Sequence, residues 1–249
     1  MSVPEKIRAD LLLVQYRLVP SRARARAEIE AGRVWCRGER ITKSSTALPI
    51  DSVLEIDRPS LQWVSRSAVK LKHALDHFQI GLAGKVVLDI GASAGGFTEV
   101  ALAHGASKVY AVDVGHDQLH DSIKADVRVV SLEGVNAREL SHSRIPEAVD
   151  AVVCDASFIG LEKILPRPLD LTSNEAVLVA LIKPQFEAGP GKVDKRGVLT
   201  DEDLQEDICL RIKVWINTKP GWVAEGIVDS PILGSDGNRE FLIAAQKRP

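Results

Sequence analysis

The chain has 249 residues, 45% hydrophobic and 27% charged, which is the composition of a folded globular protein and excludes a disordered or collagen-like chain. Its three cysteines are far apart and include no C-x-x-C pair, which argues against a disulfide framework or a structural zinc site. The longest apolar stretch, residues 176–182, is too short to span a bilayer, and the N-terminus shows no secretory signal pattern. We therefore expect a cytoplasmic protein with no membrane segment and no metal.

The net charge of −2 hides an uneven distribution along the chain. Residues 1–72 hold 14 Lys and Arg against 8 Asp and Glu, whereas the remainder holds 18 against 26. A basic N-terminal part on an acidic body is typical of a protein that binds a polyanion. An ordinary solvated surface is the alternative that charge alone leaves open.

The first 58 residues predict a small α+β module. A first helix is expected over residues 7–18, because apolar residues recur at helical spacing until Pro20 interrupts the pattern. A second helix is expected over residues 22–31, with Ser21 as its N-cap and a glycine just past its end. Short strands are expected over residues 34–36, 40–42 and 52–56.

The second helix carries a cluster of arginines. Arg22 and Arg26 stand one turn apart on it, with Arg24 beside them. Like charges at this spacing repel each other, so we expect a neutralising partner from outside the module.

Residues 8–56 resemble the alpha-L RNA-binding domain, the module shared by ribosomal protein S-four and many pseudouridine synthases. The residues that carry the resemblance are Ser21, Arg22, Ala25, Ile29, Gly32, Val34, Gly38 and Lys43. The resemblance implies binding to structured RNA, through phosphate contacts that give affinity but little sequence information. The residues implied in these contacts are Arg22, Arg24, Arg26, Arg33 and Lys43. For each arginine taken singly, a solvated surface position is the alternative.

A break in pattern at residues 57–60 separates this module from the rest of the chain. We expect an RNA-binding domain over residues 1–58, a linker over residues 59–66, and a catalytic domain over residues 67–249. The linker is short, so the two domains should be coupled.

The stretch KVVLDIGASAGGFT, residues 85–98, predicts a buried strand, a Gly-rich turn and the start of a helix. This unit cradles nucleotides in doubly wound α/β folds, because glycines let the backbone approach a ligand. Ser93 stands where a dinucleotide fingerprint would need glycine. The pattern DIGxSxGG resembles motif I of S-adenosylmethionine-dependent methyltransferases of the FtsJ type, although a plain strand-to-helix turn is an alternative. The resemblance implies S-adenosyl-L-methionine as cofactor, bound by Asp89, Gly91, Ser93, Gly95, Gly96 and Phe97.

Near-continuous apolar runs predict further strands that are buried on both faces, as in a parallel sheet. These strands are expected over residues 108–114, 128–132, 149–155 and 176–183, and two final strands over residues 222–228 and 241–245. Helices are expected between them, over residues 98–104, 115–122, 159–165 and 201–217. The fold class is therefore α/β, a Rossmann-like methyltransferase sheet with a small N-terminal α+β RNA-binding domain.

Charged residues stand at the predicted carboxyl ends of these strands, where ligands gather in such sheets. They are Asp89, Asp113, Asp155 and Lys183. Asp113 is expected to bind the ribose of the cofactor, with capping of the following turn as the alternative. Asn136 falls where such enzymes contact adenine, although the acidic segment 132–135 before it departs from the usual pattern.

Two further segments extend the resemblance. The segment S-R-x-x-x-K-L, which holds Arg66 and Lys70, resembles the entry segment of FtsJ and TlyA-type enzymes. The phrase SPILGSDGNREFL resembles the closing motif of the TlyA-type family, in which Glu240 would be the catalytic glutamate. The whole chain thus resembles the TlyA-type, or hemolysin A-like, ribosomal RNA 2'-O-methyltransferases. Carried over, the catalytic tetrad is Lys70, Asp155, Lys183 and Glu240, and Arg66 joins the RNA contacts.

These residue types suit methyl transfer to a ribose 2'-hydroxyl. The enzyme must align the reacting atoms and accept one proton. A second lysine nearby disfavours the charged form of the first, and the carboxylates orient both. We assign Lys183 as general base and Lys70 as the group that positions the hydroxyl or a phosphate. The expected substrate is a cytidine in ribosomal RNA or a ribosomal subunit.

Residues 184–199 lack a regular pattern and are long for a loop, so we expect a functional lid. Phe186 in it either stacks on a flipped nucleotide or packs inward. Three other functions remain possible from the sequence: a non-catalytic RNA-binding ribosome-assembly factor, a cytolytic hemolysin, and a methyltransferase that acts on a small molecule or protein.

Overall fold

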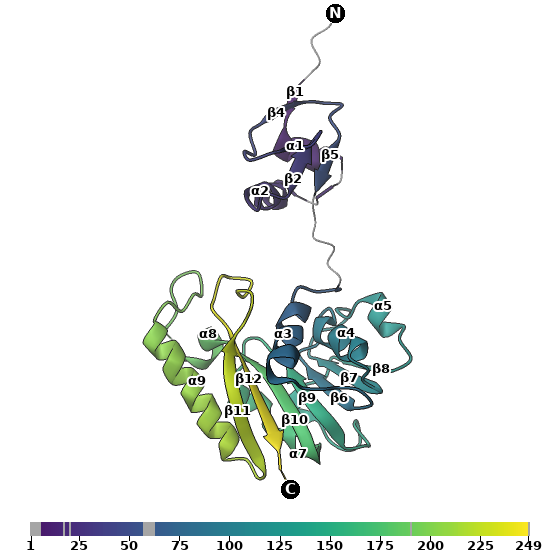
Figure 1. The fold of residues 1–249 in the computed structure, drawn as a ribbon, viewed down its shortest axis with the longest axis vertical. Coiled ribbons are helices and arrows are strands. Elements are labelled where there is room, and N and C mark those ends of the chain that lie inside the picture. The colour runs from purple at the N-terminus through teal and green to yellow at the C-terminus, as the bar shows by residue number, and fades with distance from the viewer. Residues whose placement is uncertain (1–5, 17, 20, 57–62, 190, 249) are drawn as a thin grey trace, which may run out of the picture. The chain divides into compact units, whose positions relative to one another are not determined.

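The computed structural model describes residues 6–16, 18–19, 21–56, 63–189 and 191–248 (Figure 1). The chain divides into two compact units, residues 1–61 and 62–249. The predicted break at residues 57–60, the first half of the predicted linker (residues 59–62), and the helix-ending Pro20 lie outside the described residues. No helix in the described part of the chain is both long and apolar enough to cross a membrane.

The N-terminal unit is a small α+β domain with its own core. Its elements are β1 (Lys6–Arg8), α1 (Ala9–Gln15), α2 (Arg22–Glu30), β2 (Val34–Cys36), β3 (Glu39–Arg40), β4 (Ala47–Pro49) and β5 (Leu54–Ile56). Strands β3, β2 and β5 form one antiparallel sheet, and β1 pairs with β4 in another. The two helices pack through Leu12, Leu13, Ala25 and Ile29 against Val34 of β2.

The first predicted helix is too long at both ends, because α1 begins at Ala9 and ends at Gln15. Residues 6–8 are extended because they pair with residues 47–49, a partner about forty residues away that helical spacing cannot reveal. The second helix is confirmed, and Ser21 caps it by accepting a hydrogen bond at Oγ from the Arg24 amide, 3.3 Å away.

The second unit is built on a seven-stranded sheet in the order β11-β12-β10-β9-β6-β7-β8. Its strands are β6 (Val86–Ile90), β7 (Lys108–Asp113), β8 (Val129–Glu133), β9 (Val149–Cys154), β10 (Thr172–Ile182), β11 (Trp222–Asp229) and β12 (Phe241–Lys247). Its helices are α3 (Ala68–Phe78), α4 (Gly96–Ala103), α5 (Asp121–Lys124), the 3-10 helix η1 (Ala137–Glu139), α6 (Leu161–Ile164), α7 (Pro166–Asp170), α8 (Pro184–Glu187) and α9 (Glu202–Asn217).

The sheet is mixed, with one strand reversed. Strands β8, β7, β6, β9 and β10 run parallel to their neighbours, as the apolar runs predicted. Strand β12 runs antiparallel to both β10 and β11. The first residues of β12 therefore lie at the edge where the parallel strands end, and Glu240 directly precedes β12.

Helices cover both faces of the sheet (Figure 1). On one face α3 and α4 pack through residues such as Leu71 and Val100. On the other face α6, α7 and α9 pack through residues such as Leu165 and Ile212. Cys154 is fully buried in β9, and burial raises the pKa of its thiol to about 12, so it fills the core.

The connections differ from the sequence-based expectation in two places. The helix expected over residues 115–122 reduces to α5, because the amides of Gln118 and Leu119 donate to Glu133 Oε1 rather than into a helix. The segment expected to be irregular after Lys183 begins with the short helix α8.

We predict that Gly91→Ala is more destabilising than Gly84→Ala. Both glycines have a positive φ, +79° and +72°, so a side chain costs about 1–2 kcal/mol of unfolding free energy at each. At Gly84 a Cβ meets open space, whereas at Gly91 it would lie 2.8 Å from Ala156 Cα. This clash should cost about 1–3 kcal/mol more. Urea denaturation of both variants measures the difference, and equal losses would contradict this packing.

Candidate active site

A buried lysine–glutamate pair lies at the carboxyl-end edge of the sheet. Lys70 comes from α3 and is 5% exposed, and Glu240 precedes β12 and is 4% exposed. The distance from Lys70 Nζ to Glu240 Oε2 is 2.5 Å. Because an unpaired buried charge is costly, each group lowers the cost of burying the other.

A second pair lies at the ends of β9 and β10. Lys183 Nζ lies 2.7 Å from Asp155 Oδ1, and it donates to the Asp155 carbonyl at 3.0 Å and to Ser157 Oγ at 2.8 Å. Two of the three ammonium N–H donors serve the hydrogen bonds to the Asp155 carbonyl and to Ser157, whereas Asp155 Oδ1 is in ion-pair contact but has no hydrogen-bond partner among the described residues. These contacts fix the direction in which the Lys183 side chain points.

All four of these side chains line one cavity of about 360 Å³, as the resemblance implies. Arg66, Ser157, Gln185, Phe186, Ser235 and Asp236 are among the other lining residues. The Gln185 Oε1 atom is buried without a hydrogen-bond partner among the described residues. The tetrad cavity therefore contains two paired cations and further polar groups that can meet a polar ligand.

A second cavity, of about 540 Å³, lies beside the tetrad cavity. It is lined by Asp113, Gln118, Val135, Asn136, Ile159 and other residues at the ends of β6, β7 and β9. The two cavities share Gly91, Ser93, Asp155, Ser157 and Phe158. A ligand in the second cavity thus adjoins Asp155, which is also the partner of Lys183.

Asp113 and Asn136 line the second cavity, but their oxygens already have partners. Asp113 accepts from the Ser93 amide at Oδ2 and from the Gly115 amide at Oδ1, each at 2.8 Å. Asn136 Oδ1 accepts from the Arg138 amide at 3.1 Å and caps η1. Both residues therefore hold loops around the cavity, so the capping role proposed as an alternative for Asp113 is present.

The Gly-rich turn contributes fewer lining residues than the sequence suggested. Gly91 and Ser93 line both cavities, and Phe97 lines the tetrad cavity. Asp89, Gly95 and Gly96 are not among the described residues that line either cavity. The backbone positions of Gly95 and Gly96 face neighbouring side chains instead, because an added Cβ would meet Leu119 and Ser67 respectively.

Asp89 is fully buried beneath this turn. Its Oδ2 accepts a hydrogen bond from Thr98 Oγ1 at 2.6 Å, and its Oδ1 has no partner among the described residues. Burial raises the pKa of the Asp89 carboxyl to about 7. Asp89 therefore supports the Gly-rich turn through Thr98, and its direct contact with a cofactor stays a prediction.

Two aromatic side chains stand next to the tetrad. Phe186 contacts Phe158, with ring centroids 4.9 Å apart. Phe158 is 89% exposed and has a positive φ of 64°, which non-glycine residues rarely adopt. The exposed Phe158 ring and the half-buried Phe186 ring thus form an apolar part of the lining of the tetrad cavity.

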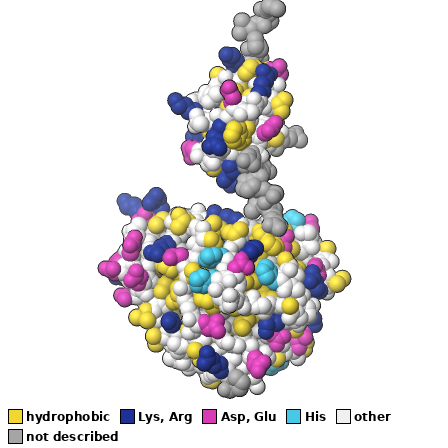
Figure 2. Space-filling model, in the orientation of Figure 1, with side chains coloured by type: hydrophobic (Ala, Val, Ile, Leu, Met, Phe, Trp, Pro, Cys, Tyr) yellow, Lys and Arg dark blue, Asp and Glu magenta, His cyan; other side chains and the backbone are white. Residues whose placement is uncertain are grey.

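Four of the arginines predicted to bind phosphate, Arg22, Arg24, Arg26 and Arg33, belong to the N-terminal unit, whose visible face shows separate groups of Lys and Arg atoms among hydrophobic, acidic and other surface (Figure 2). Acid groups within the unit itself already relieve the repulsion between these arginines, and the partner expected from outside stays a prediction. Arg22 and Arg26 approach Asp10, at 3.2 and 3.7 Å. Arg24 and Arg33 approach Glu28, at 2.8 and 2.6 Å.

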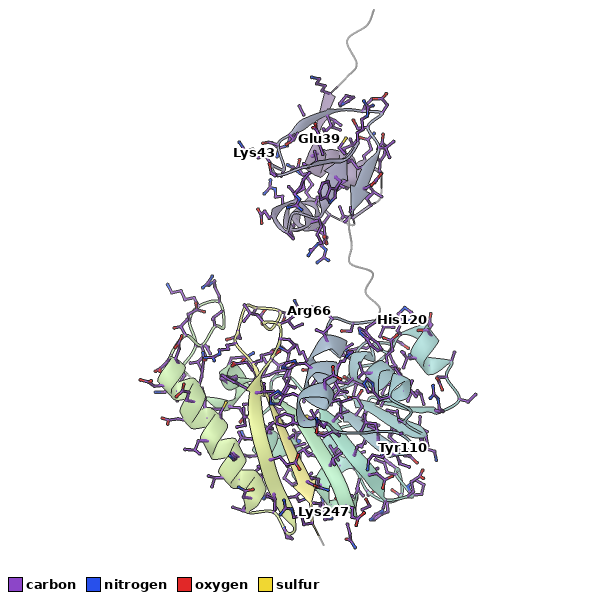
Figure 3. All side chains as sticks on the ribbon, viewed as in Figure 1. Glu39, Lys43, Arg66, Tyr110, His120 and Lys247 are labelled. Carbon is purple, nitrogen blue, oxygen red and sulfur yellow. The ribbon has the colours of Figure 1, made fainter. Side chains whose placement is uncertain are left out.

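The other two residues assigned to RNA lie apart from this cluster. Lys43 is exposed and points outward from the N-terminal unit (Figure 3). Arg66 belongs to the second unit and lines the tetrad cavity. Among the described residues no group of His, Cys, Asp and Glu is placed to hold a metal ion.

Sequence reasoning missed Ser157 and Asn238. Ser157 lies two residues after Asp155, and only its position in the strand-end phrase DASF marks it. Asn238 is 2% exposed, accepts from the Leu199 amide at 2.9 Å and donates to the Gly197 carbonyl at 3.0 Å. It thereby joins the segment expected to form a lid to the loop that precedes Glu240, and the closing motif that contains it was its only signal.

Comparison with known proteins agrees with this geometry. Residues 63–247 match the FtsJ-like methyltransferase family, and residues 7–54 match the S4 domain. The chain belongs to the FtsJ-like methyltransferase family, with an N-terminal S4 domain.

Two curated relatives and one solved structure cover most of the chain. The 16S/23S rRNA (cytidine-2'-O)-methyltransferase TlyA of Mycobacterium tuberculosis is 42% identical over 96% of this chain and 89% of its own length. Hemolysin A of Brachyspira hyodysenteriae is 40% identical over 89% of this chain and 92% of its own length. A Streptococcus thermophilus protein that carries the name hemolysin has a solved structure, 34% identical, with a TM-score of 0.77 over 99% of this chain and 90% of that one. The family and the fold expected from the sequence are therefore confirmed.

We predict that Asn238→Ala loosens residues 197–199. The Leu199 amide and the Gly197 carbonyl lose their partner, which should cost about 1–3 kcal/mol of local stability. Hydrogen exchange at the Leu199 amide should accelerate. In the control Asn217→Ala, loss of the exposed hydrogen bond to the Ala224 amide should change exchange there much less. Unchanged exchange at Leu199 would show that Asn238 does not hold this segment.

We also predict that Asp89→Asn removes part of the pH dependence of stability. The folded-state pKa of about 7 lies above the unfolded value, so the folded protein binds the extra proton between about pH 4 and pH 7. The wild type therefore loses stability relative to Asp89→Asn as the pH rises through this window, by up to about 1.4 kcal/mol per pH unit. Urea denaturation at pH 5 and pH 8 tests this sign, and a constant difference would contradict it.

Proposed function

We propose that this chain is a methyltransferase that uses S-adenosyl-L-methionine to methylate the ribose 2'-hydroxyl of a cytidine in ribosomal RNA. One observation carries the proposal: Lys70, Asp155, Lys183 and Glu240 line a single cavity that shares a wall with a second, larger cavity. A nucleophile in the first cavity and a methyl donor in the second would meet at this wall.

The residues of the second cavity fit S-adenosyl-L-methionine. The cavity lies at the carboxyl ends of the parallel strands, where nucleotide ligands bind in such folds. Val135 and Ile159 offer apolar surface for an adenine beside Asn136, the predicted adenine contact, and Asp113 lines the same cavity as the predicted ribose contact. At Gly91 the backbone comes so close to Ala156 that a Cβ would not fit. When bound, S-adenosylmethionine supplies a methyl group on a positively charged sulfonium.

The charges of the tetrad suit a cationic donor. Two lysines and two carboxylates form two ion pairs, so the site as a whole is neutral and does not repel a sulfonium. Burial strengthens these interactions by excluding water. The site can therefore hold two amines next to a positive centre without a net electrostatic penalty.

We assign Lys183 as the general base, which accepts the 2'-hydroxyl proton as a neutral amine after its ammonium has released a proton to water, and Lys70 as the positioning group. Ser157 is exposed and its hydroxyl can rotate, so it is the acceptor on Lys183 that an incoming 2'-hydroxyl would most easily replace. Asp155 would keep the amine pointed at the reacting oxygen during proton transfer. Lys70, held by Glu240, would donate to the substrate oxygen or to a phosphate. Phe158 and Phe186 offer stacking surface for the base of the target nucleotide.

The RNA partner is supported by the N-terminal unit and by a relative. The S4-domain match covers the arginine cluster, and we propose that Arg22, Arg24, Arg26, Arg33 and Lys43, with Arg66, contact phosphates. The TlyA relative is named for cytidine 2'-O-methylation of 16S and 23S ribosomal RNA. We propose functional domains over residues 1–58 and 67–249, and a cytoplasmic location, because ribosomal subunits are assembled there.

We predict that Lys183→Met and Lys70→Met abolish methyl transfer but not cofactor binding. Lys72→Met on the same helix is the matched control, because Lys72 is exposed and pairs with Asp76. Loss of a proton-transfer or positioning amine should slow single-turnover methylation by about 100-fold or more. The assay uses labelled S-adenosylmethionine with ribosomal RNA and subunits that lack 2'-O-methyl groups, and calorimetry measures cofactor affinity.

The outcomes separate the candidate functions. Near-normal methylation by Lys183→Met would overturn its role as the base. Cofactor binding without transfer to any ribosomal substrate would favour an assembly factor or a methyltransferase that acts on something other than ribosomal RNA. Lysis of erythrocytes by the purified wild-type protein would support the activity that the hemolysin name describes.

A further inference from the structure

The N-terminal unit buries two carboxylates beneath its basic surface. Asp10 on α1 is 0% exposed and Glu28 on α2 is 2% exposed. Acidic side chains are almost never buried this completely unless they are paired. Both stand in the unit that we propose binds a polyanion, where a negative charge opposes binding.

Asp10 is surrounded by three arginines. Arg8 lies 2.9 Å from its Oδ1 through Nε and donates to Oδ2 from Nη2 at 3.1 Å. Arg22 Nη2 lies 3.2 Å and Arg26 Nε 3.7 Å from the same Oδ2. These arginines come from β1 and α2, so Asp10 joins guanidinium groups from separate elements. Arg8, with its hydrogen bonds, is the main cause that lowers the pKa of the Asp10 carboxyl to about 2.

Glu28 repeats this arrangement on the neighbouring side. Its Oε1 lies 2.8 Å from Arg24 Nη2, and its Oε2 lies 2.6 Å from Arg33 Nε. Two buried acids thus hold five arginines. The arginine side chains themselves remain 35–60% exposed.

An arginine held in this way keeps most of its donors for a second partner. A guanidinium has five N–H groups in a planar fork, and each contact described here uses one or two of them. The remaining donors are available to solvent or to a phosphate oxygen. A free arginine loses rotamer freedom when it binds, whereas these have lost much of that freedom on folding.

We propose that Asp10 and Glu28 are positioning residues for RNA binding, which hold Arg8, Arg22, Arg24, Arg26 and Arg33 as a preformed array for phosphates. This inference rests on the RNA partner of the proposed function. It adds Arg8 to the contact residues. It also assigns a role in RNA binding to two acidic residues, whose negative charge by itself would repel RNA.

Positioning by the acids and total charge predict opposite changes in RNA affinity. Replacing either acid by its amide adds one positive charge to the basic unit. If only total charge mattered, RNA affinity would rise. If positioning matters, affinity falls, because the freed guanidinium groups must be ordered on binding.

The experiment compares Asp10→Asn, Glu28→Gln and Glu30→Gln in the full chain. Glu30 is exposed on the same helix as Glu28, so Glu30→Gln makes the same change in charge without touching a buried acid. The probe is ribosomal RNA without 2'-O-methyl groups, and binding is measured over a salt series. We expect Asp10→Asn and Glu28→Gln to bind about tenfold more weakly, the equivalent of ordering one or two arginine side chains anew. We expect Glu30→Gln to bind as tightly as the wild type or more tightly.

The salt dependence separates positioning from loss of fold. The slope of log affinity against log salt reports the number of phosphate contacts, so it should become shallower in the two buried-acid variants. Circular dichroism identifies any variant that does not fold. If Asp10→Asn does not fold, Glu28→Gln tests the proposal. Equal or tighter binding by folded buried-acid variants, with an unchanged slope, would overturn the inference while RNA binding by the wild type stands. Absence of RNA binding by the wild type would overturn both the RNA partner and the inference.

Discussion

Two buried ion pairs at one edge of the sheet set the organisation of the catalytic unit. Lys70 and Glu240 are separated by 170 residues in the chain and meet at 2.5 Å. Lys183 meets Asp155 across the parallel strands β9 and β10. Neither lysine could be buried without its carboxylate, because an isolated charge in the interior is strongly unfavourable. The requirement that all four groups reach the same edge explains why β12 must run against β10. Only a reversed strand starts where its parallel neighbours end.

Buried carboxylates also pair with cations in the N-terminal unit, but the exposure of the cations differs. There Asp10 and Glu28 are buried and the arginines that they hold remain exposed, whereas in the tetrad the lysines are buried with their partners. In both units a carboxylate fixes the position of a cation before any ligand arrives. These side chains lose conformational entropy during folding, so less of this loss opposes binding or the chemical step. In the proposed function, the tetrad lysines act at close range inside a cavity, and the arginines act on a solvated polyanion.

Much of this arrangement could be predicted from the sequence, because local patterns encode it. The apolar runs identified every strand of the large sheet, and the motif phrases identified the four tetrad residues that the structure brings together. What the sequence did not show depends on contacts between distant segments. The pairing of β1 with β4 shortened the first helix, and Asp10 and Glu28 neutralised arginines that seemed to need an outside partner. The burial of Asp89 is a further feature that the motif did not predict, because a motif gives the type of residue but not whether its side chain is buried or exposed. Ser157 and Asn238 carry no charge, so their roles emerge only from their hydrogen bonds.

Methyl transfer as we propose it requires that the tetrad cavity receives a ribose 2'-hydroxyl, next to a methyl donor in the adjoining cavity. The most direct test identifies the atom that receives the methyl group. Ribosomal RNA without 2'-O-methyl groups is incubated with the wild-type protein and labelled S-adenosylmethionine, digested to nucleosides and analysed by mass spectrometry. The account predicts that the label is found in 2'-O-methylcytidine. Label on a nucleobase, or no label in RNA from a protein that binds S-adenosylmethionine, would contradict it.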